Sequence, residues 1–293
     1  MGLRAANLEV RETAGAEGES PWRRRLGARR GAALGLLALL GFVAVAAFGP
    51  ALLPHDPTAV DLNRVFQRPS LTHLLGTDNY GRDILSRVVY GSRYALAVGA
   101  AAVLISGTVG TALGMAAGLA GGIVDTVIMR VVDGWLAFPT LIIALAIVTA
   151  LQPTLTNAAV AIGLAGAPWY ARVARAQALY VKQLEYVTAV RSLGAGTGRI
   201  VWRHVLPNSL GPLVIQASLQ FGTAILNLSA LGFLGIGVQP PAPEWGVMVA
   251  EGRQYMLSGE WWIAGFPGFA IMAAVIGFNF LGDALRDWLD PRA

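Results

Sequence analysis

The sequence contains no cysteine, a single lysine and few charged residues of either sign. The lack of cysteine excludes disulfide scaffolds, cysteine zinc sites, thiol catalysis and cysteine-ligated clusters. Charged residues make up 13% of the chain, whereas soluble domains carry about 25%. Hydrophobic residues reach 55%, and so few charges cannot cover a soluble surface. The composition therefore predicts an integral membrane protein.

Motifs for catalysis and cofactor binding are also missing. Lys182 follows valine rather than glycine, so the chain lacks the GxxxxGK[ST] loop that holds ATP phosphates. The histidines, His55, His73 and His204, have no metal-ligand spacing. The apolar segments lack the ionisable residues that ion-coupled carriers place at mid-depth. We therefore expect no catalytic residue, no metal site and no bound cofactor, and an energy source outside this chain.

Six apolar segments approach the length of a transmembrane helix, which needs about 20 residues. They cover residues 31–53, 94–123, 134–151, 158–171, 212–238 and 263–281. The fourth is short and contains Gly166 and Pro168, so it is either a span or a re-entrant segment. The pattern predicts an all-α integral membrane protein with about six transmembrane helices.

The arginines predict the orientation of these spans. They crowd residues 1–30 and 172–203, which six spans place on one side of the membrane. Basic loops stay on the cytoplasmic side, so we expect both termini in the cytoplasm and residues 54–93 outside. A cleavable signal peptide is the competing interpretation of the first segment, because Ala44-Val45-Ala46 imitates a cleavage site. The apolar run continues to Leu53, which favours an uncleaved span.

The domain organisation follows from the spans. We expect a disordered cytoplasmic tail over 1–30, the first transmembrane helix and external loop over 31–93, a core over 94–285 and a cytoplasmic C-terminus over 286–293. Within the external loop, residues 83–90 predict a separate amphipathic helix in which Asp83 pairs with Arg87.

Small residues recur at every fourth position of the second span. They are Ser106, Gly110, Gly114, Gly118 and Gly122. This spacing lets another helix approach closely. The partner helix belongs either to the same bundle, which we favour, or to a second subunit.

The cytoplasmic loop 175–207 carries an apolar face at helical spacing, formed by Leu184, Val187, Val190 and Leu193. Gly194 is a natural stop for that helix. A second helix is expected over 197–205, with Pro207 preventing its continuation. Two short helices at a glycine bend predict a docking element for a soluble partner.

These residues resemble the EAA loop of ABC-importer permeases. Ala189, Gly194, Leu206 and Pro207 match the family pattern, whereas Thr188 replaces its glutamate, Val190 its second alanine and His204 its isoleucine. Residues 185–187 and 203–208 resemble the C-type permeases of dipeptide, oligopeptide and nickel importers. Blocks at 75–83, 233–246 and 279–291 resemble the signatures of the same subfamily, in the same order.

The resemblance implies a type I, MetI-like permease bundle in a bacterial or archaeal plasma (inner) membrane. Its implied partners are a second homologous permease, two ATPase subunits that bind ATP and Mg²⁺, and an external solute-binding protein. The implied ATPase-docking residues are Glu185, Thr188, Ala189, Arg191, Leu193, Gly194, Leu206 and Pro207. For Leu206 and Pro207 a purely structural role is the alternative. No enzyme activity is expected of this chain.

The substrate class implied is short peptides. A bare nickel ion would require imidazole or thiolate ligands along its route, and the spans contain neither. Neutral polar residues are the candidates for lining a translocation path: Gln216, Gln220, Asn227 and Asn279. A nickel or other metal chelate, or another small solute, is the alternative cargo. A stand-alone secondary carrier is the alternative of another class, and the loop argues against it.

Overall fold

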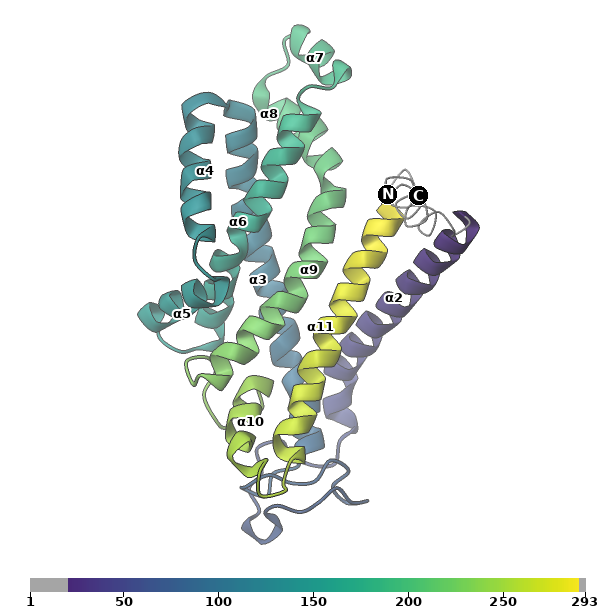
Figure 1. The fold of residues 1–293 in the computed structure, drawn as a ribbon, viewed down its shortest axis with the longest axis vertical. Helices are drawn as coiled ribbons and strands as arrows, with labels where there is room; N and C mark the ends of the chain where they lie inside the picture. Colours follow the sequence, from purple (N-terminus) through teal and green to yellow (C-terminus); the bar gives the residue numbers. More distant parts are fainter. Residues whose placement is uncertain (1–20, 290–293) are drawn as a thin grey trace, which may run out of the picture.

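The computed structural model describes residues 21–289, and these form a helical bundle (Figure 1). Across this range the only strand-like pairing is an isolated bridge between Thr77 and Asp83, so the all-α prediction is confirmed. The main helices are α2 Pro21–Leu52, α3 Ile84–Ala120, α4 Gly122–Leu136, α5 Thr140–Leu151, α6 Leu155–Val181, α7 Glu185–Ser192, α8 Thr197–Ile200, α9 Leu206–Phe233, α10 Trp245–Gly252 and α11 Trp262–Leu289.

Both ends of the described range are helical where we had predicted tails. Residues 1–20 of the expected disordered tail lie outside the described residues, and α2 begins at Pro21, inside the remainder of that tail. At the other end, α11 continues to Leu289. The expected C-terminal segment 286–293 is therefore helical as far as it is described.

Four described helices are long and apolar enough to cross a bilayer: Gly35–Leu52 of α2, α3, the helix Thr197–Phe233 and α11. The pair α4 and α5 makes a fifth if it is counted as one span. The predicted fourth segment lies in α6, whose 27 residues rise about 40 Å, but α6 is not among the helices apolar enough for this count. The expected number of six spans is therefore not confirmed within residues 21–289.

We expected the third segment, 134–151, to be one helix, but it is broken near its start. Residues 134–136 end α4 and residues 140–151 form α5, and the two helices meet at a bend of 92°. The break falls at Pro139, whose side chain removes a backbone donor and pushes the preceding Phe138 away from helical geometry. Hydropathy alone predicts a continuous helix here, and Pro139 turns it sharply.

Close packing between α3 and α6 forms the centre of the bundle. The Ser106 hydroxyl donates to the Gly163 carbonyl at 2.7 Å. A Cβ atom added to Gly110 would lie 2.2 Å from the Ala167 carbonyl oxygen, and one added to Gly114 would lie 2.2 Å from that of Ala171. The small-residue face of α3 therefore packs within this chain, as favoured above. Gly122 is the exception, because nothing lies within 4 Å of its added Cβ.

Two local predictions were wrong. Residues 84–90 are not a separate helix but the first turns of α3, and the Asp83 side chain caps that helix by accepting from the Ser86 amide at 2.8 Å. Asp83 therefore does not pair with Arg87. Likewise, Pro207 does not end a helix. It sits in the first turn of α9, directly after the π-helical turn Val201–Val205, where its missing N–H leaves no donor unpaired.

The outer loop is fastened to the bundle by a buried group of charges. Arg82 donates to Asp78 at 2.6 Å and to Glu251 at 2.8 Å. Arg87 donates to the same Glu251 carboxylate at 3.1 Å. Nearby, the Trp262 indole N–H donates to the Thr77 carbonyl at 3.2 Å. These contacts hold the loop after α2 against α3, α10 and α11.

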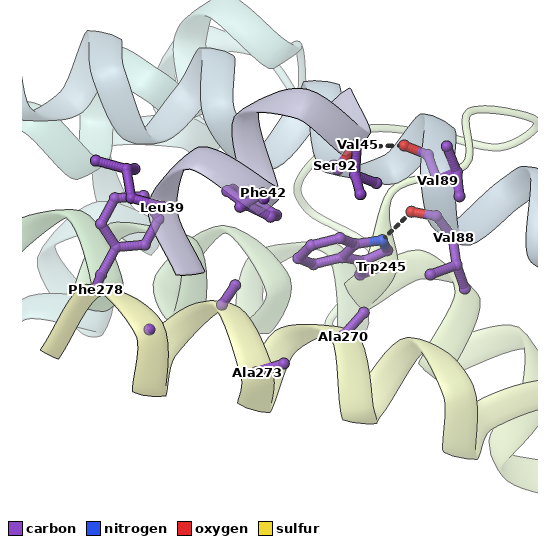
Figure 2. Close-up of a pocket in the computed structure, with 13 residues that line it drawn as sticks. Leu39, Phe42, Val45, Val88, Val89, Ser92, Trp245, Ala270, Ala273 and Phe278 are labelled. Atoms are coloured by element: carbon purple, nitrogen blue, oxygen red, sulfur yellow. Dashed lines mark hydrogen bonds between the residues drawn. The ribbon is translucent and has the colours of Figure 1, made fainter. Parts of the chain in front are cut away.

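An apolar cavity of about 310 Å³ lies between α2, α3, α10 and α11. Figure 2 shows Phe42, Trp245 and Phe278 around it, with the Trp245 N–H donating to the Val88 carbonyl at 2.8 Å. The residues around it carry no charge. Apart from the Ser92 hydroxyl and the Trp245 N–H, which donate to the Val89 and Val88 carbonyls, the lining is apolar.

Candidate functional site

The loop between α6 and α9 contains α7 and α8, and α7 extends beyond the rest of the bundle at one end (Figure 1). α7 covers Glu185–Ser192, as the apolar spacing predicted. Glu185 lies in its first turn and Arg191 in its last, the positions at which each charge is favoured by the helix dipole. The sequence therefore stabilises a helix that is only two turns long.

Gly194 ends α7 in the left-handed conformation, with φ of 86°. Its amide donates to the Arg191 carbonyl at 2.9 Å, and the Ala195 amide donates to the Val190 carbonyl at 3.3 Å. This pair of hydrogen bonds is the Schellman motif, which favours glycine at this position. An added Cβ on Gly194 would meet nothing within 4 Å, so backbone conformation alone requires the glycine.

One face of the loop is anchored in the bundle. Val187 and Val205 are fully buried, and Ile200 nearly so. They pack in one cluster with residues of α3, α6 and α9, among them Met115 and Tyr170. The apolar spacing that we interpreted as a docking face therefore serves in part to attach α7 to its own chain.

The other face is open to solvent. Of the eight predicted docking residues, Leu206 is half-buried and the other seven are exposed: Glu185, Thr188, Ala189, Arg191, Leu193, Gly194 and Pro207. Leu193 is 87% exposed. An exposed leucine is ordinary by itself, so the interest of Leu193 is its position at the end of α7, directly before the Gly194 stop.

Two exposed aromatic residues were missed by the sequence argument. Trp202 is 73% exposed and Tyr180 is 64% exposed, both beside the same loop. Aromatic residues are enriched where proteins bind one another. The exposure of Trp202 could have been predicted from the helix expected over 197–205. On that helix Trp202 does not share the face that carries Ile200 and Val205.

Polar contacts connect α7 to the start of α9. The Asn208 amide group donates to the Tyr186 hydroxyl at 3.1 Å and to the His204 carbonyl at 2.6 Å. The Tyr186 and His204 rings lie 5.8 Å apart. Tyr186 and Asn208 thus join the two ends of the loop, so α7 and α9 are coupled through side chains as well as through the chain.

A pair of ionic contacts connects α6 to α4 below the loop. Arg175 donates to both carboxylate oxygens of Asp125, at 2.5 and 2.7 Å. Arg172 lies 2.7 Å from Asp133. The Arg175–Asp125 pair is bidentate and therefore fixes orientation as well as distance. The loop therefore rises from a helix that is held on two sides, by α3 and by α4.

The four candidate path residues differ in their surroundings. Gln216 and Asn227 are half-buried on α9, and Asn279 is exposed on α11. Gln220 is only 5% exposed. A Cβ atom added to Gly166 of α6 would lie 2.0 Å from its Nε2, so Gln220 fills the interface between α6 and α9. Asn279 lies against α9 elsewhere, since its Oδ1 is 3.5 Å from a Cβ atom added to Gly222.

The fold and the loop define a multi-span helical membrane protein that presents one short helical element at one end. Residues 110–293 match the family model described as binding-protein-dependent transport system inner membrane component. Residues 20–69 match the model described as N-terminal TM domain of oligopeptide transport permease C. The chain belongs to this family of inner membrane components, which are permease subunits of ABC importers.

Several curated relatives are similar over most of their length. The dipeptide transport system permease protein DppC of Alkalihalophilus pseudofirmus is 44% identical over 93% of this chain and 90% of that protein. The probable D,D-dipeptide transport system permease protein DdpC of Escherichia coli is 47% identical over 84% and 82%. The di/tripeptide transport system permease protein DppC of Pseudomonas aeruginosa is 44% identical over 90% and 88%.

A solved structure has the same fold. It is a chain of the MetNI methionine ABC transporter in an inward-facing conformation, which matches with a TM-score of 0.56 at 19% identity. The match covers 70% of this chain and 97% of that one. The predicted MetI-like permease bundle is thus confirmed as the fold.

Proposed function

We propose that this chain forms half of the translocation pathway of an ATP-driven importer of short peptides. The three relatives described above are named as permeases for dipeptides or for di- and tripeptides. This supports peptides over nickel as the cargo. The second half of the pathway is a homologous permease, and a solute-binding protein delivers the peptide from outside.

The observation that carries this proposal is the construction of α7. Its exposed end at Leu193 and Gly194 is available to a partner, while Val187 is fully buried in a cluster shared with α3, α6 and α9. A force applied to the exposed face is therefore delivered to three helices at once. Two ATPase subunits supply that force when they close on ATP and Mg²⁺, which bind to those subunits rather than to this chain.

The arrangement of the ends supports a cytoplasmic location for α7. The first described residues of α2 and the last of α11 lie toward the same end of the bundle as α7, and the loop between α2 and α3 lies at the opposite end (Figure 1). This agrees with the arginine pattern. In the proposal, both termini and α7 face the cytoplasm of a bacterial cell and the loop after α2 faces out.

The path itself is weakly polar. Gln216, Asn227 and Asn279 offer neutral hydrogen-bonding groups that are at least partly exposed in this subunit, whereas Gln220 supports the α6–α9 interface. Neutral groups interact with a zwitterionic peptide without trapping it.

The proposed ATPase contacts lie on α7 and at its end. They are Glu185, Thr188, Ala189 and Arg191, together with Leu193 and Gly194.

Uptake into proteoliposomes tests the proposal. The vesicles hold the complete complex, with both permeases, the ATPases and the solute-binding protein. We expect labelled di- and tripeptides to accumulate on the side of the membrane that holds the ATPase subunits. This accumulation should require ATP on that same side. ATP-driven uptake of a nickel chelate, with neither uptake of nor competition by peptides, would show that the cargo is wrong while leaving the transport mechanism intact.

A further inference from the structure

Three potential metal ligands meet in the outer loop, although they are distant in sequence. His55 follows the end of α2, His73 lies in the middle of the loop, and Asp83 is the residue that caps α3. One ligand atom from each lies within 4.8 Å of the other two. His73 and Asp83 are 3% and 5% exposed, and His55 is half-buried. The site is therefore a built cluster rather than a chance meeting of mobile surface groups.

The spacing of these groups suits a divalent transition-metal ion. His73 Nδ1 lies 2.9 Å from the Asp83 Oδ1 atom. Two ligand atoms at about 2.0–2.1 Å from one tetrahedral ion lie about 3.3–3.4 Å apart, so His73 and Asp83 need to separate by only about 0.4 Å to admit it. The His55 and His73 ring centroids lie 4.7 Å apart, which is close to the separation of about 5 Å expected for two imidazoles on one tetrahedral ion.

The remaining hydrogen bonds do not compete for the same atoms. Asp83 accepts from the Ser86 amide through Oδ2, so its Oδ1 is available to an ion while the helix cap is kept. Two imidazoles and one carboxylate form a donor set that zinc and nickel prefer over calcium or magnesium. Water completes the coordination.

We propose that His55, His73 and Asp83 bind a divalent transition-metal ion, for which zinc is the appropriate probe. The ion replaces the proton that joins His73 Nδ1 to Asp83. It connects the end of α2 to the start of α3 through the middle of the loop, and so fixes the outer surface of the subunit. This inference does not depend on which solute the importer carries.

The positive charge of Arg64 lies beside His73 and disfavours the binding of a metal ion there. Its Nη1 lies 3.4 Å from His73 Nε2, and its Nε lies 3.1 Å from the Asp61 carboxylate. When an ion occupies Nδ1, the proton of neutral His73 moves to Nε2 and faces the guanidinium. Arg64 is half-exposed, so it can turn toward Asp61. Removing its charge should therefore strengthen metal binding.

Zinc titration of the purified full chain tests the proposal, using a tag without histidine and competition with a chromophoric chelator. The absence of cysteine removes thiol binding as a background. We expect one zinc ion per chain and at least about a tenfold loss of affinity in His55→Ala and in Asp83→Asn. Asp83→Asn retains a capping side chain, and the His55 side chain is only half-buried, so both variants should fold.

Two further variants complete the test. His204→Ala changes the third histidine, which lies in the loop at the other end of the bundle, and should leave zinc affinity unchanged. Arg64→Gln should increase it. The proposal is overturned if the wild-type chain binds no more zinc than His55→Ala, or if His204→Ala weakens binding as much as His55→Ala does.

Discussion

Lys182, the single lysine of the chain, donates its ammonium group to the Gly118 carbonyl at 2.7 Å. Gly118 lies in the last turn of α3, where carbonyl groups have no partner within the helix. Lys182 directly follows α6 and precedes α7. The start of the loop between α6 and α9 is thus attached to the end of α3 by a hydrogen bond from a charged group. Movement of α7 is expected to reach α3 through this contact as well as through the packing of α6.

Lys182→Met should lower the stability of the folded chain. A hydrogen bond to a charged group contributes about 1.5–3 kcal/mol, and the variant leaves the Gly118 carbonyl with no donor from the side chain. The measurement is thermal unfolding of the purified subunit in detergent. Lys182→Arg is the matched control, because it keeps a cationic donor and should retain most of the stability. Equal unfolding temperatures for wild type and Lys182→Met would contradict this role.

Gly110→Val should disrupt the packing of α3 against α6. Even an alanine Cβ would lie 2.2 Å from the Ala167 carbonyl oxygen, and overpacking of this kind costs about 1–3 kcal/mol. We expect a lower unfolding temperature and reduced assembly. Gly134→Ala is the control, because nothing lies within 4 Å of an added Cβ there, and alanine is favoured in a helix by about 1 kcal/mol. The account is wrong at this interface if both substitutions have the same effect.

Gly194→Val should uncouple ATP hydrolysis from the arrival of substrate. Valine disfavours the φ of 86° that ends α7, at a cost of about 1–2 kcal/mol, so the loop should lose the geometry on which docking depends. The measurement is ATPase activity of the reconstituted complex with and without loaded binding protein. Gly196→Ala is the control, since Gly196 has φ of −68° and open space around it. Full substrate stimulation in Gly194→Val would exclude α7 as the transmission element.

The features that the sequence could predict are those encoded within one turn or one helix. The spacing of Leu184 to Leu193 and the following Gly194 predicted α7 and its end, because a Schellman motif involves only neighbouring residues. The apolar lengths likewise predicted helices α2, α3, α9 and α11, and the small residues of α3 predicted close packing.

The features that could not be predicted depend on distant contacts or on local competition. Arg87 binds Glu251, which lies 164 positions away, and no local pattern distinguishes that partner from Asp83. Pro139 turns a helix and Pro207 does not, because Pro207 falls in a first turn where no donor is required. The meeting of His55 and His73 likewise depends on the folding of the whole outer loop.

Glu244 should make stability depend on pH. It caps α10 by accepting from the Gly246 and Val247 amides, each at 2.9 Å, outside the spanning helices. Burial raises its pKa from 4.5 to about 7, although the two amide hydrogen bonds oppose the change. Because the folded-state pKa is the higher one, its contribution to stability is complete below pH 4.5 and is lost as the pH rises through 7.

The measurement is the unfolding temperature of the subunit between pH 5 and 8, compared with that of Glu244→Gln. A shifted group changes stability by up to about 1.4 kcal/mol per pH unit, and the variant should lack this part of the pH dependence. Glu185→Gln, at an exposed glutamate, is the control and should follow the wild type. Parallel curves for wild type and Glu244→Gln would show that burial does not hold the proton on Glu244.

The central claim is that the exposed end of α7 contacts an ATPase, and site-specific cross-linking tests it most directly. The chain has no native cysteine, so the substitution Leu193→Cys introduces its single thiol. A photoreactive maleimide attached to this thiol reacts only with its immediate neighbours. In membranes that contain the complete transporter, we predict an adduct with the ATPase subunit. Leu71→Cys, 97% exposed at the opposite end, should give no such adduct. Absence of an ATPase adduct from position 193, or equal adducts from both positions, would contradict the account.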